Sequence, residues 1–406
     1  MPQKRKYSLK SFLDILAVKS MSTGVIARKV KCHISTCLRY LRELKGLGEV
    51  VEQRISNTIN LWGVTGKRIL LIDIDSTIPN LALMKISTYH KSHGDNVRLI
   101  KLKLKKHKDG TLKDGIKVDF SDKSDKAYIS VIYKNNKQVV DNLVLQHPDI
   151  TFDVGGSGYD LHKTLPDEIE NLKPDYSLYP NCDQSIGFSS RGCIRNKKTC
   201  PFCIVSKKEG KYRRTQHPEE WYNPEFEKIT FMDNNILADP EWFMEITSWC
   251  MEKKLEMWFN QGLDIRLLDE EIAKRLYETR NYHHMITFAW DHIEDEAIVK
   301  EKVALLKSVG FTKNMCRAKI QFYVYVHDDS DYDSGVYRCR ELKKMWCNAY
   351  VMYNIDNERT RRIKDLQRWA IRKIFYWIND ISDYKANIRE AKTIRAKSSK
   401  AGVAET

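Results

Sequence analysis

Residues 185–205 read SIGFSSRGCIRNKKTCPFCIV, a short apolar run that leads into a polar loop with three cysteines. These are Cys193, Cys200 and Cys203, with six residues between the first two and two between the last two. Of the ten cysteines in the chain, only Cys182 stands near this group in the sequence. Thiolates are soft ligands that bind iron–sulfur clusters and zinc. One tight group of this kind indicates metal or cluster binding rather than a disulfide framework.

Three thiols on one loop can bind three irons of a [4Fe–4S] cubane and leave the fourth iron without a protein ligand. Ser-Arg-Gly-Cys followed by Cys-Pro-Phe-Cys resembles the signature of the radical S-adenosylmethionine (SAM) family. The resemblance extends over roughly residues 180–350. The family pattern has three residues between its first two cysteines, whereas this chain has six, residues 194–199. The resemblance implies an enzyme in which Cys193, Cys200 and Cys203 bind the cluster and SAM chelates its open iron. An electron then cleaves SAM to a 5′-deoxyadenosyl radical that abstracts hydrogen from a substrate.

The resemblance also implies residues that contact SAM and a protein that donates the electron. Phe202 stands where the family has an aromatic residue against the SAM adenine. Residues that follow the second and third predicted strands of the barrel resemble those that approach the amino group and the ribose or carboxylate of SAM; they are Asp233, Asn234, Asn235, Asn260, Gln261, Asp264 and Arg266. Each of them is equally interpretable as a loop cap. The main alternative for the cysteines is a structural zinc site formed by Cys182, Cys193, Cys200 and Cys203, or with His217 in place of one of them.

Downstream of the loop, five apolar runs each end in polar residues. With residues 186–189 they predict six strands; the runs are 228–232, 256–259, 285–289, 319–326 and 349–352. Helical stretches lie between them at 241–254, 269–279 and 297–309. This series predicts an α/β fold with a partial (β/α)6 TIM-type barrel over residues 179–356. In such barrels the chemistry lies at the carboxyl ends of the strands, where these polar residues fall.

Residues 67–178 predict an open α/β unit with strands near 67–75, 97–103, 127–133 and 150–154, and a helix near 80–92. It resembles the cobalamin-binding-like Rossmann domain that often precedes a radical SAM core. The Asp-x-His-x-x-Gly motif that binds cobalamin is missing after the first strand, so we expect no cobalamin. The Gly155-Gly156-Ser157-Gly158 segment is interpretable as a tight turn or as an anion cradle. The segment 99–126 predicts an exposed loop.

Residues 1–66 predict three helices, at 7–19, 22–30 and 33–44, and two short strands, at 49–53 and 58–62. This order resembles a winged helix-turn-helix, whose third helix enters the major groove of DNA. The residues that would contact DNA or RNA are Ser35, Thr36, Arg39, Arg42 and, near the wing tip, Arg54. The alternative is that this module docks against protein.

Charge supports an anionic partner. The chain has a net charge of +15, and residues 1–66 contribute twelve Lys/Arg against four Asp/Glu. A basic solvated surface without a partner is the alternative. The sequence has no apolar run long enough for a spanning helix, so we expect a cytoplasmic protein without membrane contact. Residues 357–406 predict basic helices and a disordered tail.

The predicted function is a radical SAM enzyme acting on an unidentified substrate, with nucleic acid or nucleotides as one class. The alternative is a nucleic-acid-binding regulator with a structural or redox-sensing Fe–S or zinc site.

Overall fold

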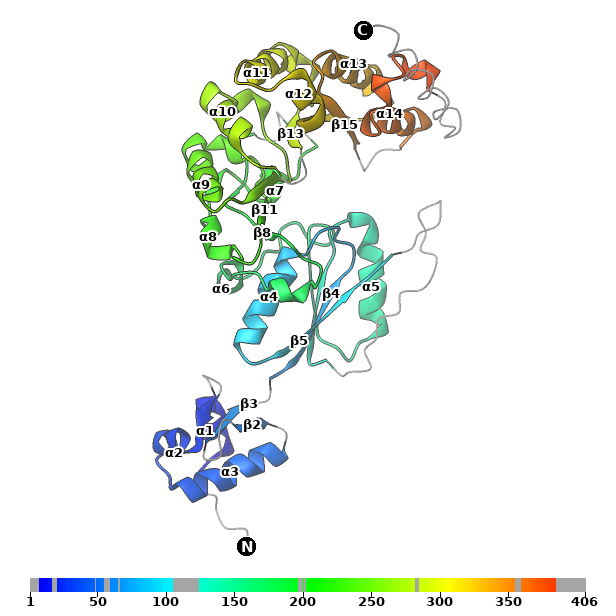
Figure 1. Cartoon of the computed structure of the whole chain (residues 1–406). Helices are drawn as coiled ribbons and strands as arrows, with labels where there is room; N and C mark the ends of the chain where they lie inside the picture. Colours follow the sequence, from blue (N-terminus) through cyan, green and yellow to red (C-terminus); the bar gives the residue numbers. More distant parts are fainter. Residues whose placement is uncertain are drawn as a thin grey trace. The chain divides into compact units, whose positions relative to one another are not determined.

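The computed structural model of the chain describes residues 7–16, 20–47, 49–54, 59–64, 66–104, 124–195, 200, 202–281, 285–354 and 359–384. The chain divides into two compact units, Met1–Cys182 and Asp183–Thr406 (Figure 1). Both combine helices with parallel strands, which confirms the predicted mixed α/β class. Within the described residues, no helix has the length and apolarity needed to cross a membrane.

The first unit begins with three helices and a small antiparallel sheet. The helices are α1 (Leu9–Leu16), α2 (Thr23–Val30) and α3 (Ile34–Gly46), and the strands are β1 (Met21–Ser22), β2 (Val50–Arg54) and β3 (Asn60–Val64) in the order β1-β3-β2. The helices and β2–β3 lie where the sequence predicts them, whereas β1 was not predicted because two residues carry no alternation pattern. Trp62 of β3 is fully buried among the helices, and its indole N–H donates to Thr23 Oγ1 at 3.0 Å.

A four-stranded parallel sheet forms the rest of the first unit. Its order is β5 (Asn96–Lys101), β4 (Arg68–Asp73), β6 (Lys126–Ser130) and β7 (Phe152–Gly155). Helices α4 (Leu81–Ser92) and α5 (Lys137–Gln146) lie on either side of this sheet (Figure 1), and a short helix, α6 (Asp167–Glu170), follows. The apolar residues of β4 are buried on both faces, as in other parallel sheets. The predicted strands and α4 are present. Residues 105–123 of the predicted exposed loop lie outside the described residues.

The second unit contains the six predicted strands of the β/α series. Three form one parallel sheet in the order β12 (Glu256–Phe259), β11 (Lys228–Phe231) and β8 (Ser185–Gly187). The other three form a second parallel sheet in the order β13 (Ile286–Ala289), β14 (Ile320–Val326) and β15 (Asn348–Tyr353). Two isolated parallel bridges, Met257 to Asn281 and Leu263 to Phe288, link the two sheets. The strands therefore follow one another in chain order.

Helices lie on the outer side of these strands (Figure 1). They are α8 (Pro218–Trp221), α9 (Pro240–Glu252), α10 (Glu270–Glu278), α11 (Glu296–Ser308), α12 (Lys313–Lys319), α13 (Tyr332–Lys344) and α14 (Arg361–Ile371). One core joins the strands to the helices, with Phe231, Phe288 and Phe322 from strands and Phe243 and Leu276 from helices all buried. This core fixes the carboxyl ends of the strands, where the polar residues lie. The predicted disordered tail falls among residues 385–406, outside the described residues.

Candidate functional site

The cysteine loop leaves the parallel strands of the second unit through a short antiparallel pair, β9 (Ser190–Arg191) and β10 (Arg213–Arg214). Gly192 starts the loop with φ of +80°, and a Cβ at this position would lie 2.2 Å from the carbonyl oxygen of Lys211. Only glycine fits this close approach without moving the backbone. A short helix, α7 (Val205–Lys208), follows the last cysteine. The loop therefore has a fixed entry and exit.

Cys193, Cys200 and Cys203 line one pocket together with Phe202, Asn235 and Asp264. The pocket encloses about 720 Å³ of space, open solvent included. Other residues on its wall follow three successive strands: Asn234 after β11, Gln261 after β12 and Asp291 after β13. The cysteines and the strand-end polar residues thus meet in one place.

Each of the three sulfurs accepts hydrogen bonds from nitrogen donors. The backbone N–H of Arg195 and Nδ2 of Asn235 donate to Cys193 Sγ at 3.4 and 3.5 Å. The Arg195 guanidinium donates to Cys200 Sγ at 3.3 Å, and the backbone N–H of Val205 donates to Cys203 Sγ at 3.5 Å. Such bonds stabilise thiolates and tune the potentials of bound clusters. Each of the three sulfurs therefore has at least one N–H donor directed at it.

The three residues Asp233, Asn234 and Asn235 after β11 hydrogen-bond to the start of the cysteine loop. The buried carboxylate of Asp233 accepts hydrogen bonds from the backbone N–H and hydroxyl groups of Ser189 and Ser190, at 2.5–3.1 Å. Asn234 Oδ1 accepts from the N–H of Gly192 at 3.0 Å, and Asn235 reaches Cys193. Burial raises the pKa of Asp233, and the hydrogen bonds from the two serines oppose that rise. Asp233 therefore holds the loop, whereas Asn234 and Asn235 also face the pocket.

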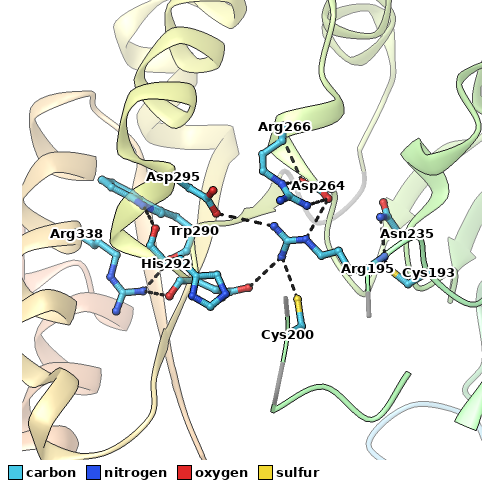
Figure 2. Close-up of polar contacts among 11 residues, drawn as sticks. Cys193, Arg195, Cys200, Asn235, Asp264, Arg266, Trp290, His292, Asp295 and Arg338 are labelled. Carbon is cyan, nitrogen blue, oxygen red and sulfur yellow. Dashed lines mark hydrogen bonds and ion pairs between the residues drawn. The ribbon is translucent and has the colours of Figure 1, made fainter. Parts of the chain in front are cut away.

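Arg195 lies at the centre of a group of charges in the pocket (Figure 2). Its guanidinium pairs with Asp264 at 3.5 Å and with Asp291 and Asp295 at 3.9 Å each. Asp264 is also bound by the Arg266 guanidinium at 2.7 and 2.9 Å. Among the described residues, Asn235 Oδ1 is buried without a hydrogen-bond partner, whereas the buried Arg195 Nε lies 3.5 Å from Asp264 Oδ2. Buried polar atoms are rarely left unpaired in native proteins, so Asn235 Oδ1 is suited to a bound ligand.

Burial and charge move the pKa values of these groups in different directions. Burial raises the pKa of Asp264, but the hydrogen bond from Arg266 and the charge of Arg195 offset this and leave it below its usual range. Burial raises the pKa of Asp291, which Arg195 only partly opposes. Burial also raises the pKa of the Cys200 and Cys203 thiols. Metal coordination removes the proton from such thiols, so loading the site releases protons.

The remaining residues predicted to contact SAM have different positions. Phe202 lines the pocket, but its ring stacks on that of Tyr325, with centroids 3.8 Å apart. Gln261 lines the pocket. Asn260 does not line this pocket in the described structure; its Nδ2 lies 3.4 Å from the sulfur of Met232. Arg266 reaches the pocket only through Asp264.

Two arginines that bear on the pocket were not predicted from the sequence. Arg195 lies inside the cysteine spacing that departs from the family pattern, and its charge within that segment was the available signal. Arg338 of α13, which lies beside Trp290 in Figure 2, is fully buried. It donates to the carbonyl oxygens of Trp290, Asp291 and Tyr325 at 2.7–3.0 Å. It thus ties together the carboxyl ends of β13 and β14. No sequence pattern distinguishes this buried arginine from the many exposed ones.

Of the alternative zinc ligands, His217 does not line this pocket in the described structure. His217 caps α8, accepting the N–H of Glu219 at 3.3 Å, and its ring packs on Trp242 and Trp249. Cys182 is the last residue of the first unit. Among the described residues, no group of three or more His, Cys, Asp or Glu side chains has the arrangement of a single-ion site. The thiolates of a cubane bind different irons, so a cluster does not require them to converge on one point.

The carboxyl edge of the sheet in the first unit also carries acidic residues and the glycine segment. Asp75 accepts the N–H groups of Ile132 and Tyr133 and Nδ2 of Asn136 at 2.7–3.1 Å. A Cβ on Gly156, which has φ of +96°, would lie 2.2 Å from the carbonyl oxygen of Val131. The glycines therefore allow close packing of one loop on another, which supports the tight-turn interpretation.

The predicted nucleic-acid contacts lie on α3 and β2. Ser35, Arg39 and Arg42 are exposed and Thr36 is half-buried on α3, and Arg54 is exposed on β2. Ser35 Oγ shares a hydrogen bond of 2.8 Å with His33 at the start of α3. The Arg39 guanidinium lies 5.3 Å from the ring centre of Tyr40. The helix thus presents two arginines one turn apart.

Comparison with known protein families gives no match to this chain, and comparison with curated proteins gives none either.

Proposed function

We propose that the chain is a radical SAM enzyme whose Cys193, Cys200 and Cys203 bind a [4Fe–4S] cluster. The observation that carries this proposal is the convergence of all three cysteines on one pocket, with an N–H donor directed at each sulfur. The donor set fits the group, because thiolates are the usual ligands of iron–sulfur clusters. Three protein ligands leave one iron for SAM.

We also propose which type of domain each part of the chain forms. The six parallel strands of the second unit correspond to a partial (β/α)6 barrel, and the pocket lies at their carboxyl ends, where barrel enzymes place their chemistry. The four-stranded sheet of the first unit corresponds to a Rossmann-like domain without cobalamin. The three helices and small sheet before it correspond to a winged helix. The proposed limits of these domains are residues 1–66, 67–178, 179–356 and 357–406.

Residues of this chain would hold SAM in the remaining space of the pocket. When bound, the cluster supplies the electron that cleaves SAM to a 5′-deoxyadenosyl radical, which abstracts hydrogen from the substrate. Asn234, Asn235 and Gln261 offer amide donors and acceptors on the pocket wall, and Asp264 offers a carboxylate kept ionised by Arg266. Phe202 offers an aromatic face on the same wall. These side chains would orient SAM and exclude water from it.

The experiment is anaerobic reconstitution with iron and sulfide, then dithionite reduction with SAM, scoring 5′-deoxyadenosine by chromatography. Cys→Ala at 193, 200 or 203 is expected to reduce product formation to background. Cys182→Ala is the matched control: it leaves a three-cysteine cluster intact but would remove a ligand of the four-thiolate zinc site. Stoichiometric zinc without SAM cleavage would overturn the proposal in favour of a metal-containing regulator.

The second part of the proposal is that the N-terminal region binds DNA or RNA, as carrier of the substrate or as a regulatory target. The exposed Arg39 and Arg42 on α3 support it, since arginines contact phosphates and base edges. Fluorescence anisotropy with duplex DNA and with RNA, at several salt concentrations, is the measurement. Arg39→Ala with Arg42→Ala should weaken binding and lower the salt slope by about 2. Lys10→Ala, which removes an exposed charge on α1, should change neither, and equal effects of both changes would contradict specific use of α3.

A further inference from the structure

We infer that Arg195 is a positioning residue that holds two of the three cysteine ligands and raises the reduction potential of the cluster. This inference rests on the proposed function and concerns a residue outside the three ligands. The backbone N–H of Arg195 donates to Cys193 Sγ, and its guanidinium donates to Cys200 Sγ (Figure 2). One residue therefore contacts the two sulfurs that the six-residue segment separates.

Arg195 lies within the cysteine loop and faces the pocket. Arg195 stands two residues after Cys193, inside the segment 194–199. Its side chain turns into the pocket, where only 16% of it is exposed. Arg195 thus places a fixed cation beside Cys193 and Cys200.

A fixed cation at this distance stabilises the reduced cluster. Reduction adds one negative charge to the cluster and its thiolates, and arginine remains protonated at all relevant pH values. Net charge and hydrogen bonds to the sulfurs are principal determinants of cluster potentials. In a partly buried pocket the attraction is screened less than it would be in water. Arg195 is therefore expected to move the midpoint potential upward.

The carboxylates around Arg195 act in the opposite direction. Asp264, Asp291 and Asp295 fix the guanidinium in place, and each brings a negative charge toward the cluster. Asp264 is in turn paired with Arg266. Asp295 precedes α11 and makes no side-chain hydrogen bond to the start of that helix. Asp295→Asn thus removes one opposing charge without removing a helix cap.

The test is a mediator titration of the reconstituted full-length chain without SAM, followed by electron paramagnetic resonance. Arg195→Gln should lower the midpoint potential by at least about 59 mV, which for one electron is a tenfold change in the reduction equilibrium. Arg195→Lys keeps the charge but loses the planar fork, and its midpoint should fall between those of wild type and Arg195→Gln. Asp295→Asn should raise the midpoint. Opposite shifts from the two charge changes are a signature that general loosening of the loop would not produce.

Each outcome separates this inference from the proposed function. A wild-type chain that holds no iron and sulfide after reconstitution overturns the proposed function and the inference together. A chain that holds a cluster with the same midpoint in wild type, Arg195→Gln and Asp295→Asn overturns the inference alone. If Arg195→Gln fails to retain iron, Asp295→Asn decides, because an unchanged or lowered midpoint in that variant contradicts the electrostatic role.

Discussion

The carboxyl ends of the two groups of parallel strands carry similar side chains and use them differently. In the first unit, Asp73 is fully buried and bound by Ser76 and by the Tyr179 hydroxyl, while Asp75 binds two backbone N–H groups and Asn136. In the second unit, acidic and amide side chains after β11, β12 and β13 surround a pocket with three cysteines. Similar strand-end side chains therefore bind neighbouring groups in the first unit and line a pocket in the second.

The difference shows which observation carries functional meaning. Polar residues after a parallel strand are common to binding sites and to loops that need caps. In the first unit the donors and acceptors satisfy one another, whereas in the second Asn235 Oδ1 on the pocket wall is buried without a hydrogen-bond partner among the described residues. Matching donors with acceptors thus distinguishes a structural edge from a binding edge.

The largest effect is expected from Asp233→Asn. This change tests how far the strand ends of the second unit depend on the hydrogen bonds that hold the cysteine loop. The amide directs an N–H group toward the donors of Ser189 and Ser190, so buried donors lose their acceptor. We expect the free energy of unfolding to fall by about 3 kcal/mol, since each unsatisfied buried group costs roughly 1–3 kcal/mol. Hydrogen exchange of the full chain should show weaker protection around β8 and β9, with less iron retained.

The matched change in the first unit is Asp75→Asn. It removes a carboxylate that accepts three hydrogen bonds at the edge that we interpret as structural. It should weaken protection around β6 and leave iron content unchanged. Iron loss from Asp75→Asn equal to that from Asp233→Asn would remove the distinction between the two edges.

An intermediate effect is expected from Gly156→Ala in the first unit. The new Cβ would lie 2.2 Å from the Val131 carbonyl oxygen at a φ of +96°, and strained backbone of this kind costs about 1–3 kcal/mol. Gly155→Ala is the control, because its Cβ would meet only Lys163 Cδ at 3.8 Å. Urea unfolding of the full chain, followed by exchange at β6 and β7, measures both. Equal destabilisation by both substitutions would contradict the close packing and reopen the anion-cradle interpretation.

The smallest effect is expected from Asp175→Asn, which tests internal pairing in the first unit by pH. Burial raises the pKa of Asp175, but bonds from Lys91, Ser177 and Ser87 outweigh it, so the folded-state pKa lies below the usual value of about 3.9. The stabilisation is therefore present above that value and is lost as pH falls below it and through the lower folded-state pKa. Thermal unfolding between about pH 5 and 3 should depend less on pH in Asp175→Asn than in wild type. Parallel curves would contradict the pairing.

The sequence predicted the strands of the parallel sheets and several helices because their apolar periodicity is strong, but it did not predict helices α5 and α13. All six strands from β8 to β15 in the two parallel sheets appeared as apolar runs ending in polar residues, and α9, α10 and α11 as amphipathic stretches. Strand β1 and the division of the six strands into two sheets were not predicted. The first has only two residues, and the second depends on pairing between strands, which no local pattern reports.

Prediction of the site was less complete, since side-chain partners depend on tertiary contacts. Cys193, Cys200, Cys203, Asn235 and Asp264 were singled out, and the structure brings them to one pocket. Asp233 was assigned to SAM by position, but its oxygens are bound by Ser189 and Ser190. Arg195 and Arg338 were missed, because an arginine in a basic chain stands out only when its buried partners are known.

The chain order of the strands has a consequence for synthesis on the ribosome. The cysteine loop belongs to the part of the chain that forms β8, β11 and β12, whereas Ala289 and Asp291 on the pocket wall come with β13. At about 5–20 residues per second, Arg195 is made roughly 5–20 s before Asp291 and Asp295. The ligands therefore exist before the wall that encloses them.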